Sequence, residues 1–435
     1  MVRTLEQTTM RKVYLRLLPF AILTYFLCYL DRINVSFAAL TMNHDLGLSA
    51  SDYGFALGAF FWGYCLFEVP SNMVLEKVGA RLWIARIMVT WGILSGATAF
   101  CTGPYSFLAV RFLLGVAEAG LYPGIVLFLT YWFPDQHRAR IMAGFTLALP
   151  GAVALGGPIS TALLGLDGIW GLAGWKWMYL AEAAPTVLLG IAVLFYVTDR
   201  PAAAGWLSDE ERAWLSATMD GERRQVEARR KVSLVRSFFE PKVLLLALNF
   251  LGIVTASLGM LFFLPQIIKQ LGTTNMQVGW AVMITYACGS VSMVVWGWLS
   301  DRTGERRWNL FAACLLAAAG LILAGMTIGT YWSLVGAAIA ATGLYGTKGM
   351  FWSLPSMLLT GPAAAAGIAW INSLGNLGGS FGPWFVGRIK DSTGSFADGF
   401  YMLAGFALMS ALVAALGLRM PRPVASAQGL GVAAE

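Results

Sequence analysis

The chain has 435 residues, of which 58% are hydrophobic and only 12% charged, and its mean hydropathy is +0.67. A water-soluble globule of this length needs more polar surface than this composition supplies, so the chain is predicted to be an integral membrane protein. Its net charge of +7 comes from basic residues in the loops between apolar stretches. We therefore attribute this charge to membrane orientation and not to nucleic-acid binding.

Twelve apolar stretches are long enough to cross about 30 Å of hydrocarbon as helices. Six precede a polar stretch near residue 200 and six follow it. The predicted spans are Leu15–Leu40, Tyr53–Leu75, Leu82–Cys101, Tyr105–Phe133, Ile141–Gly165, Lys176–Val197, Val243–Ile268, Gln277–Leu299, Asn309–Gly329, Tyr331–Leu359, Ala364–Arg388 and Gly399–Leu418.

The six-plus-six arrangement predicts an all-α membrane protein built from two pseudo-symmetric six-helix bundles. We expect bundles at residues 1–198 and 242–420, a cytoplasmic linker at 199–241 and a cytoplasmic tail at 421–435. In the linker, Ser208 and Glu211 have the spacing of a capping box, which predicts a short helix through Trp214 along the membrane surface.

The distribution of Lys and Arg predicts the orientation of the chain. If both termini lie in the cytoplasm, the cytoplasmic stretches hold 23 of the 30 basic residues and the opposite loops hold four. Short loops rich in basic residues stay inside the cell, so we expect a multi-pass protein of the inner (plasma) membrane with both termini cytoplasmic.

Two turns that are 225 positions apart share an acid, a base and a glycine, and each follows the second span of its half. This repeat indicates a doubled membrane unit, as in transporters whose halves rock around a central site. We expect both turns to act as gates, with an ion pair that latches the halves in one state. The gating residues are Glu76, Lys77, Gly79 and Arg81 in the first turn and Asp301, Arg302, Gly304 and Arg306 in the second.

Seven charged residues of the predicted spans are candidates for burial in the membrane, where a charge at the bilayer centre costs on the order of 2.5–3.5 kcal/mol on insertion scales. They are Asp31, Arg32, Glu68, Arg111, Glu118, Glu182 and Lys348. For Glu68 and Glu182, near helix ends, we expect structural pairing.

The three cations Arg32, Arg111 and Lys348 predict that an anion completes the site, because guanidinium groups match carboxylates bidentately. Asp31 and Glu118 are candidate proton carriers, since burial and a neighbouring Arg shift a carboxyl pKa in opposite directions. The structural alternative is that Asp31, Arg111 and Glu118 only pair with one another and lock the first half.

Several segments resemble the major facilitator superfamily and, within it, the anion:cation symporter family, over nearly the whole chain. They are Tyr29–Ser36, Arg111–Gly124, Trp132–Pro134 with Arg138–Arg140, Trp206–Leu207 with Glu211, and Asn372–Gly379. Asn72 departs from the family by replacing the Gly that usually opens the first turn.

The resemblance implies proton-coupled uptake of an organic carboxylate, such as a sugar acid, a tartrate-like dicarboxylate or an aromatic acid. It implies that Asp31 and Glu118 couple protons and that Arg32 and Arg111 bind the anion. The resemblance also implies cavity-lining roles for Tyr29, Tyr64, Trp352, Asn372 and Asn376. Lys348, beside Phe351–Pro355, is similar to the tartrate and phthalate branch, in which a third cation could hold a second carboxylate.

We therefore expect alternating access with symport of protons and an organic anion by a monomer in the lipid bilayer, without cofactor, metal or nucleic acid. The alternative within the superfamily is a drug or metabolite:proton antiporter, suggested by Gly151, Gly156, Gly157 and Pro158. Enzyme activity is not expected. Gly378–Gly382 matches a serine-hydrolase motif, but it lies in a Gly-rich membrane segment with no strand before it.

Overall fold

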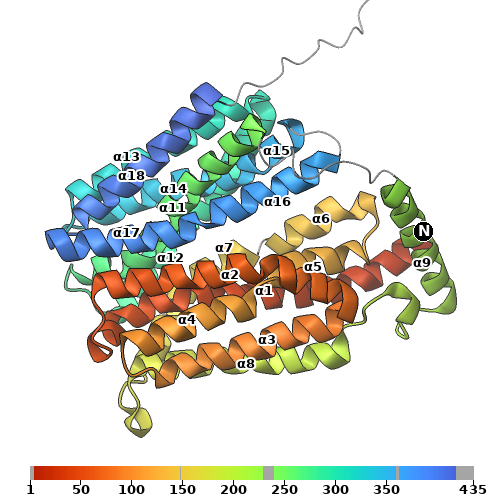
Figure 1. Ribbon diagram of the computed structural model, residues 1–435, viewed down its shortest axis with the longest axis horizontal. Coiled ribbons are helices and arrows are strands. Elements are labelled where there is room, and N and C mark those ends of the chain that lie inside the picture. Colours follow the sequence, from red (N-terminus) through yellow and green to blue (C-terminus); the bar gives the residue numbers. More distant parts are fainter. Residues whose placement is uncertain (1–3, 147, 229–239, 359–361, 418–435) are drawn as a thin grey trace, which may run out of the picture.

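The computed structural model describes residues 4–146, 148–228, 240–358 and 362–417, and within these ranges all regular secondary structure is helical. The chain forms two halves that lie against each other, with the first half below and the second above in Figure 1. The predicted tail at 421–435 lies outside the described residues.

Eight helices and a short 3₁₀ turn, Thr98–Phe100, form the six spans of the first half. The helices are α1 (Leu5–Asp45), α2 (Ala50–Val78), α3 (Ala80–Ala97), α4 (Pro104–Glu118), α5 (Leu121–Thr130), α6 (Asp135–Thr146), α7 (Ala148–Leu164) and α8 (Gly174–Tyr196).

The second half repeats this pattern. Its helices are α11 (Pro241–Lys269), α12 (Asn275–Thr303), α13 (Arg306–Met326), α14 (Trp332–Phe351), α15 (Ser353–Leu358), α16 (Pro362–Asn376), α17 (Gly378–Thr393) and α18 (Ala397–Leu412), followed by a π turn at Val413–Gly417.

Each of the twelve predicted spans therefore coincides with a helix or with two helices in sequence. Among the described residues, nine spans are long and apolar enough by themselves to cross a membrane. The other three are α2, α14 with α15, and α16 with α17. They have more Gly, Ser and Tyr, because helices that pack closely against other helices need small and polar side chains as well as apolar ones.

Among the described residues, three of the predicted spans are divided into two α-helices, and the span Tyr105–Phe133 is broken at a defined residue. Gly120 adopts a left-handed backbone conformation (φ +87°), so α4 ends at Glu118 and α5 starts at Leu121. A Cβ at this position would also lie 2.5 Å from Ser71 Oγ. The break was not predicted, and it places Tyr122 in a different helix from Arg111 and Glu118.

The two halves meet mainly where α2 packs on α17, α7 on α12 and α1 on α11. The hydrogen bonds that join them, within the described ranges, lie toward the end of the bundle that carries the α1–α2 connection, which we call the far end. Tyr53 Oη bonds Phe262 O at 3.3 Å, and Asp391 accepts from Ser51 N at 2.7 Å.

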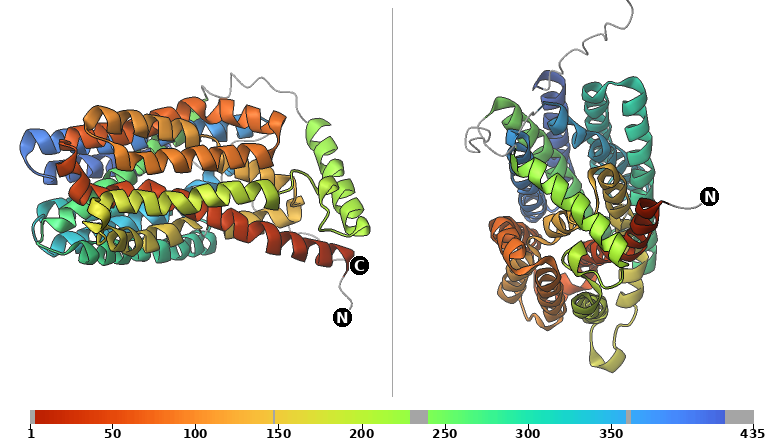
Figure 2. Two further views of the ribbon diagram at one scale, coloured as in Figure 1. Left: turned by 90° about the horizontal axis from the view of Figure 1, so that it is seen from below. Right: turned by 90° about the vertical axis from the view of Figure 1, so that its right-hand side faces the viewer.

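Helix α9 (Asp209–Ala228) lies across the opposite end of the molecule, which we call the α9 end (Figure 2). The predicted capping box is confirmed, with Ser208 N to Glu211 Oε2 at 2.9 Å and Glu211 N to Ser208 Oγ at 3.2 Å. Glu211 also pairs with Lys12 of α1 at 2.8 Å, and Glu222 pairs with Arg138 of α6 at 2.9 Å. These contacts attach α9 to the first half.

Candidate functional site

Arg32 of α1 and Glu118, the last residue of α4, form an ion pair in the middle of the first half. Arg32 Nη2 lies 2.5 Å and Nε 2.7 Å from Glu118 Oε1, to which Cys28 Sγ also donates at 3.1 Å. The Glu118 side chain is fully buried, whereas 20% of the Arg32 side chain remains exposed. Glu118 Oε2 has no hydrogen-bond partner among the described residues, so the pair uses one carboxylate oxygen only.

Aromatic rings surround the Arg32 guanidinium. Its Cζ lies 5.0 Å from the ring centre of Tyr64 and 5.5 Å from those of Tyr29 and Phe60. The π faces of these rings stabilise a cation that has little water around it. The predicted residues Tyr29, Arg32, Tyr64 and Glu118 are thus close neighbours, contributed by α1, α2 and α4.

Asp31 points away from this pair, because consecutive residues of a helix project about 100° apart. It accepts hydrogen bonds from Trp91 Nε1 at 2.7 Å and from Ser95 Oγ, both on α3, and from Asn34 Nδ2 at 3.2 Å. Asp31 is 4% exposed. The two predicted proton carriers therefore occupy separate environments.

Arg111 is 1% exposed and lies with its Cζ 5.0 Å from the ring centre of Phe60. Its electrostatic neighbours are Asp31, Tyr53 and Tyr179. Within the described part of the chain no carboxylate comes within ion-pair distance of it, and its Nε and Nη1 have no hydrogen-bond partner. In this conformation Arg111 is thus buried inside the first half, unlike Arg32.

The second half contributes a cation that faces the first half. Lys348 Nζ of α14 lies 4.0 Å from the ring centre of Tyr345, and Tyr345 interacts electrostatically with Tyr29 of α1. Trp352 is 39% exposed and packs on Phe250, with ring centres 5.0 Å apart. Lys348 thus lies against Tyr345 and Arg32 against Tyr29, two tyrosines that interact electrostatically.

Asn372 and Asn376 are spaced four residues apart, on one face of α16, and both are half-buried. The helix ends at Asn376, and α16 packs on α11 and α2. These residues stay predicted cavity-lining residues.

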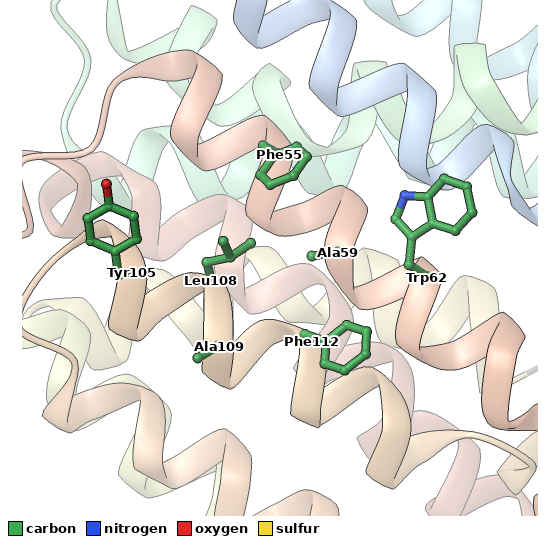
Figure 3. Close-up of a pocket in the computed structure, with 7 residues that line it drawn as sticks. All are labelled: Phe55, Ala59, Trp62, Tyr105, Leu108, Ala109 and Phe112. Atoms are coloured by element: carbon green, nitrogen blue, oxygen red, sulfur yellow. The ribbon is translucent and has the colours of Figure 1, made fainter.

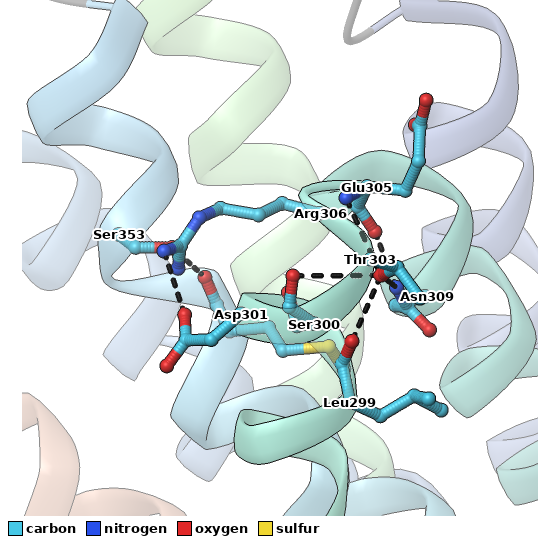
Figure 4. A network of polar contacts seen from close by, with 9 residues as sticks. Leu299, Ser300, Asp301, Thr303, Glu305, Arg306, Asn309 and Ser353 are labelled. Atoms are coloured by element: carbon cyan, nitrogen blue, oxygen red, sulfur yellow. Dashed lines mark hydrogen bonds and ion pairs between the residues drawn. The ribbon is translucent and has the colours of Figure 1, made fainter.

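The two repeated turns have similar local structures. Gly79 (φ +99°) ends α2 and Gly304 (φ +67°) ends α12, both in backbone conformations that favour glycine. Arg306 pairs with Asp301 at 2.9 Å and donates to Ser353 Oγ of α15 at 2.6 Å, as Figure 4 shows. That network stays inside the second half.

In the first turn the polar partner is a residue that the sequence did not indicate. Arg81 N donates to Asp199 Oδ1 at 2.7 Å, just after α8 ends. Glu76, Lys77 and the Arg81 side chain are exposed. Among the described residues neither turn latches the two halves in this conformation, in which the hydrogen bonds between halves lie toward the far end. The gating role predicted for the two turns therefore stays a prediction about a different conformation of the transporter.

A second group of buried polar residues was also missed. Glu182 of α8 accepts from Asn34 Nδ2 at 2.9 Å and from Ser160 Oγ of α7 at 2.8 Å. The i, i+3 spacing of Asp31 and Asn34 could have indicated that Asn34 bonds Asp31. The participation of Glu182 and Ser160 depends on packing between helices.

An apolar groove in the described residues lies away from these charges. It has a volume of about 430 Å³ and runs between α2 and α4, with Phe55, Trp62 and Phe112 among its lining residues (Figure 3). Phe55 and Trp62 are large exposed hydrophobics, as expected of a surface against lipid. It contains none of the predicted charged residues.

Two six-helix halves that surround buried charges define the class of a multi-pass membrane transport protein. Comparison with known proteins agrees. The model of the Major Facilitator Superfamily matches residues 21–383, and the chain belongs to this family. Membership makes it a transporter and not an enzyme.

Two relatives and one solved structure illustrate the similarity. An Agrobacterium vitis protein named "Putative tartrate transporter" is 50% identical over 409 residues, covering 94% of each chain. The Acinetobacter baumannii quinolone resistance transporter is 40% identical over 400 residues, covering 92% of each. A D-xylose-proton symporter has the same fold, with a TM-score of 0.75 at 14% identity over 93% of this chain and 98% of its own.

Proposed function

We propose that this transporter carries an organic carboxylate, with tartrate-like dicarboxylates as the preferred class, in symport with protons. Residues 1–198 and 242–420 act as the two rocking units, joined by the linker at 199–241. Basic residues concentrate at the α9 end, so this end faces the cytoplasm of the cell with both termini.

The observation that carries the proposal is the Arg32–Glu118 ion pair. Arg32 is partly exposed and Glu118 is fully buried, so an entering carboxylate competes with Glu118 for the same guanidinium. A proton on Glu118 removes its negative charge and frees Arg32 for the substrate. Anion binding and proton binding then favour each other, which is the linkage that symport requires.

Lys348 supplies the second cation of the proposed site. It comes from the other half, and its neighbour Tyr345 interacts electrostatically with Tyr29, which lies against Arg32. One carboxylate on Arg32 and a second on Lys348 would connect the halves through the substrate. The similarity to the Agrobacterium vitis relative supports this dicarboxylate assignment.

Arg111 is assigned as the counter-charge of Asp31 in the conformation described, and it reaches the anion only after the halves move. Because the hydrogen bonds between the halves lie toward the far end, which is opposite the cytoplasmic α9 end, we assign this conformation as inward-facing.

Charge balance makes protons necessary, because moving one elementary charge across 100 mV is worth about 2.3 kcal/mol, and a negative interior repels an anion.

Uptake by the purified protein in proteoliposomes with an imposed pH gradient tests the proposal. Labelled L-tartrate, a sugar acid and an aromatic acid are compared. We expect the dicarboxylate to accumulate when the outside is acidic and an uncoupler to abolish accumulation. Equal distribution with and without the gradient would contradict symport.

A specific observation favours a second function, drug or metabolite:proton antiport. The chain is 40% identical to the quinolone resistance transporter, and α7 contains Gly156, Gly157 and Pro158. In the same vesicles an antiporter would release protons as a fluoroquinolone enters. Proton flow in the direction of the substrate supports symport, and opposite flow supports antiport.

A further inference from the structure

A buried polar cluster lies on the side of α1 opposite the Arg32–Glu118 pair. It consists of Asp31 and Asn34 of α1, Ser95 of α3, Ser160 of α7 and Glu182 of α8. Asn34 is completely buried, and its side-chain nitrogen donates to both carboxyl groups, at 3.2 Å to Asp31 Oδ1 and 2.9 Å to Glu182 Oε2. One amide therefore bridges two acids.

Two negative charges on this cluster would be poorly compensated. Glu182 is 5% exposed and, in the described part of the chain, no Lys, Arg or His lies within ion-pair distance of it. An uncompensated ion in such an interior costs several kcal/mol. The charged and titratable groups that act on the cluster are Arg111 and Glu118 of α4, Cys28 of α1 and Tyr179 of α8, all on the Asp31 side.

The hydrogen bonds around the cluster fit a single proton. A protonated Glu182 can donate to Ser160 Oγ, which lies 2.8 Å from Oε1, while Oε2 still accepts from Asn34. Asp31 has three donors, Trp91, Ser95 and Asn34, which suit an ionised carboxylate. With one proton on Glu182, every carboxyl oxygen of the cluster takes part in a hydrogen bond, and the cluster carries a single negative charge, on Asp31.

We propose that Asp31 and Glu182 form one coupled acid pair, bridged by Asn34, that binds a single proton during the transport cycle. The proposal deepens the proposed proton symport and rests on it for its functional meaning. It assigns to Glu182 a role that its sequence position, near a helix end, did not suggest. When two acids interact by more than about one pK unit, the proton belongs to the pair and not to either residue.

The cluster also has a route to the moving parts of the molecule. Ser160 follows Gly157 by one helical turn on α7, and Gly157 packs directly on Gly279 of α12, where an added Cβ would lie 2.5 Å from Gly279 O. A change of hydrogen bonding at Ser160 can therefore shift α7 where it packs on α12, at the contact between the halves. Proton binding by the pair can thus act on the rocking motion.

Infrared difference spectroscopy of the purified protein in H₂O and D₂O tests the pair without any substrate. Glu182→Gln keeps the hydrogen bonds of the neutral acid and removes the second carboxyl, so the wild type should show a carboxylic-acid C=O band at neutral pH that the variant lacks. Glu182→Asp should retain a band. Asp167→Asn, at the loop before α8, should leave the spectrum unchanged. Identical spectra for the wild type and Glu182→Gln would overturn the proposal.

The pH dependence of L-tartrate uptake gives the functional readout. In Glu182→Gln, Asp31 keeps its three donors without an acidic neighbour, so its protonation requires lower pH, and the midpoint should shift down by about one pH unit. Tartrate counterflow without a pH gradient verifies that the variant is folded. An unshifted midpoint in an active variant contradicts the pair, whereas absence of proton-driven uptake by the wild type contradicts the proposed symport and leaves the infrared result standing.

Discussion

Arg32 and Glu118 show how a membrane interior tolerates charge. The guanidinium is held by one carboxylate oxygen and three aromatic rings, and part of it remains accessible. A fully satisfied pair would only stabilise the first half, but in the part of the chain that the structure describes Glu118 Oε2 lacks a partner, and Arg32 is 20% exposed. The pair is therefore suited to open when a competing anion and a proton arrive together.

Replacing Glu118 with Gln should separate coupling from binding. The amide has the shape of the protonated acid and leaves Arg32 free, so exchange of tartrate should persist while accumulation driven by a pH gradient is lost. The measurement is paired counterflow and gradient-driven uptake in proteoliposomes. Glu76→Gln, an exposed acid in the first turn, is the control for loss of a carboxylate. Accumulation at the wild-type level by Glu118→Gln would refute its role.

At the scale of elements, two contacts close the far end. The backbones of α2 and α17 approach each other closely, and a carboxylate of α17 caps the N-terminus of α2. An added Cβ on Gly54 of α2 would lie 2.3 Å from Pro383 O of α17. The Asp391 carboxylate of α17 accepts from Ala50 N at 3.2 Å and Ser51 N at 2.7 Å, which are the first amides of α2. An anion at a helix N-terminus is favourable, so the contact holds the ends together.

Gly54→Ala should open the far end, because the methyl group meets backbone that cannot move without displacing α17. Spin labels on the α1–α2 and α17–α18 connections should report longer distances. Gly405→Ala is the matched control, since an added Cβ there meets nothing within 4 Å. Unchanged distances in Gly54→Ala would show that this contact does not limit opening.

Asp391→Ala should weaken the same closure by about 1 kcal/mol, the usual cost of losing a helix cap, or about fivefold in the closed-to-open ratio. Partial burial would by itself raise the pKa of Asp391, but hydrogen bonds from Ser51 and the α2 backbone hold it below its usual range. The stabilisation is thus complete above the ordinary carboxyl pKa and is lost as pH falls through the lowered one.

The same pair of spin labels checks this prediction across acidic pH. Asp398→Ala removes an exposed acid from the first turn of α18 at the same end and should behave as the wild type. A wild-type response in Asp391→Ala at every pH would mean that the carboxylate does not support closure.

Helix α9 depends on Glu211, which completes the capping box and pairs with Lys12. Glu211→Ala should weaken the docking of α9 by about 1 kcal/mol and speed hydrogen exchange of residues 209–228 about fivefold. The neighbouring exposed Glu210→Ala is the control. Equal exchange in both variants would show that docking relies on other contacts, such as Glu222 with Arg138.

At the scale of the whole molecule, the sequence predicted the architecture because bilayer thickness imposes a length and an apolar composition on each span. The sequence also named Tyr29, Arg32, Tyr64 and Glu118 as candidate site residues, and their side chains are neighbours in the structure. The break at Gly120 had a signal in Gly120 and Pro123, but an apolar run masks it. The bridging of Asp31 to Glu182 had none, because it depends on how α1 and α8 are rotated against each other.

The central claim is that a carboxylate binds Arg32 when a proton binds Glu118. The most direct measurement is calorimetric titration of L-tartrate into the purified protein in buffers of different ionisation enthalpy, which counts protons taken up on binding. The account predicts proton uptake by the wild type and a smaller uptake by Glu118→Gln. Tartrate binding with no uptake of protons by the wild type would contradict it.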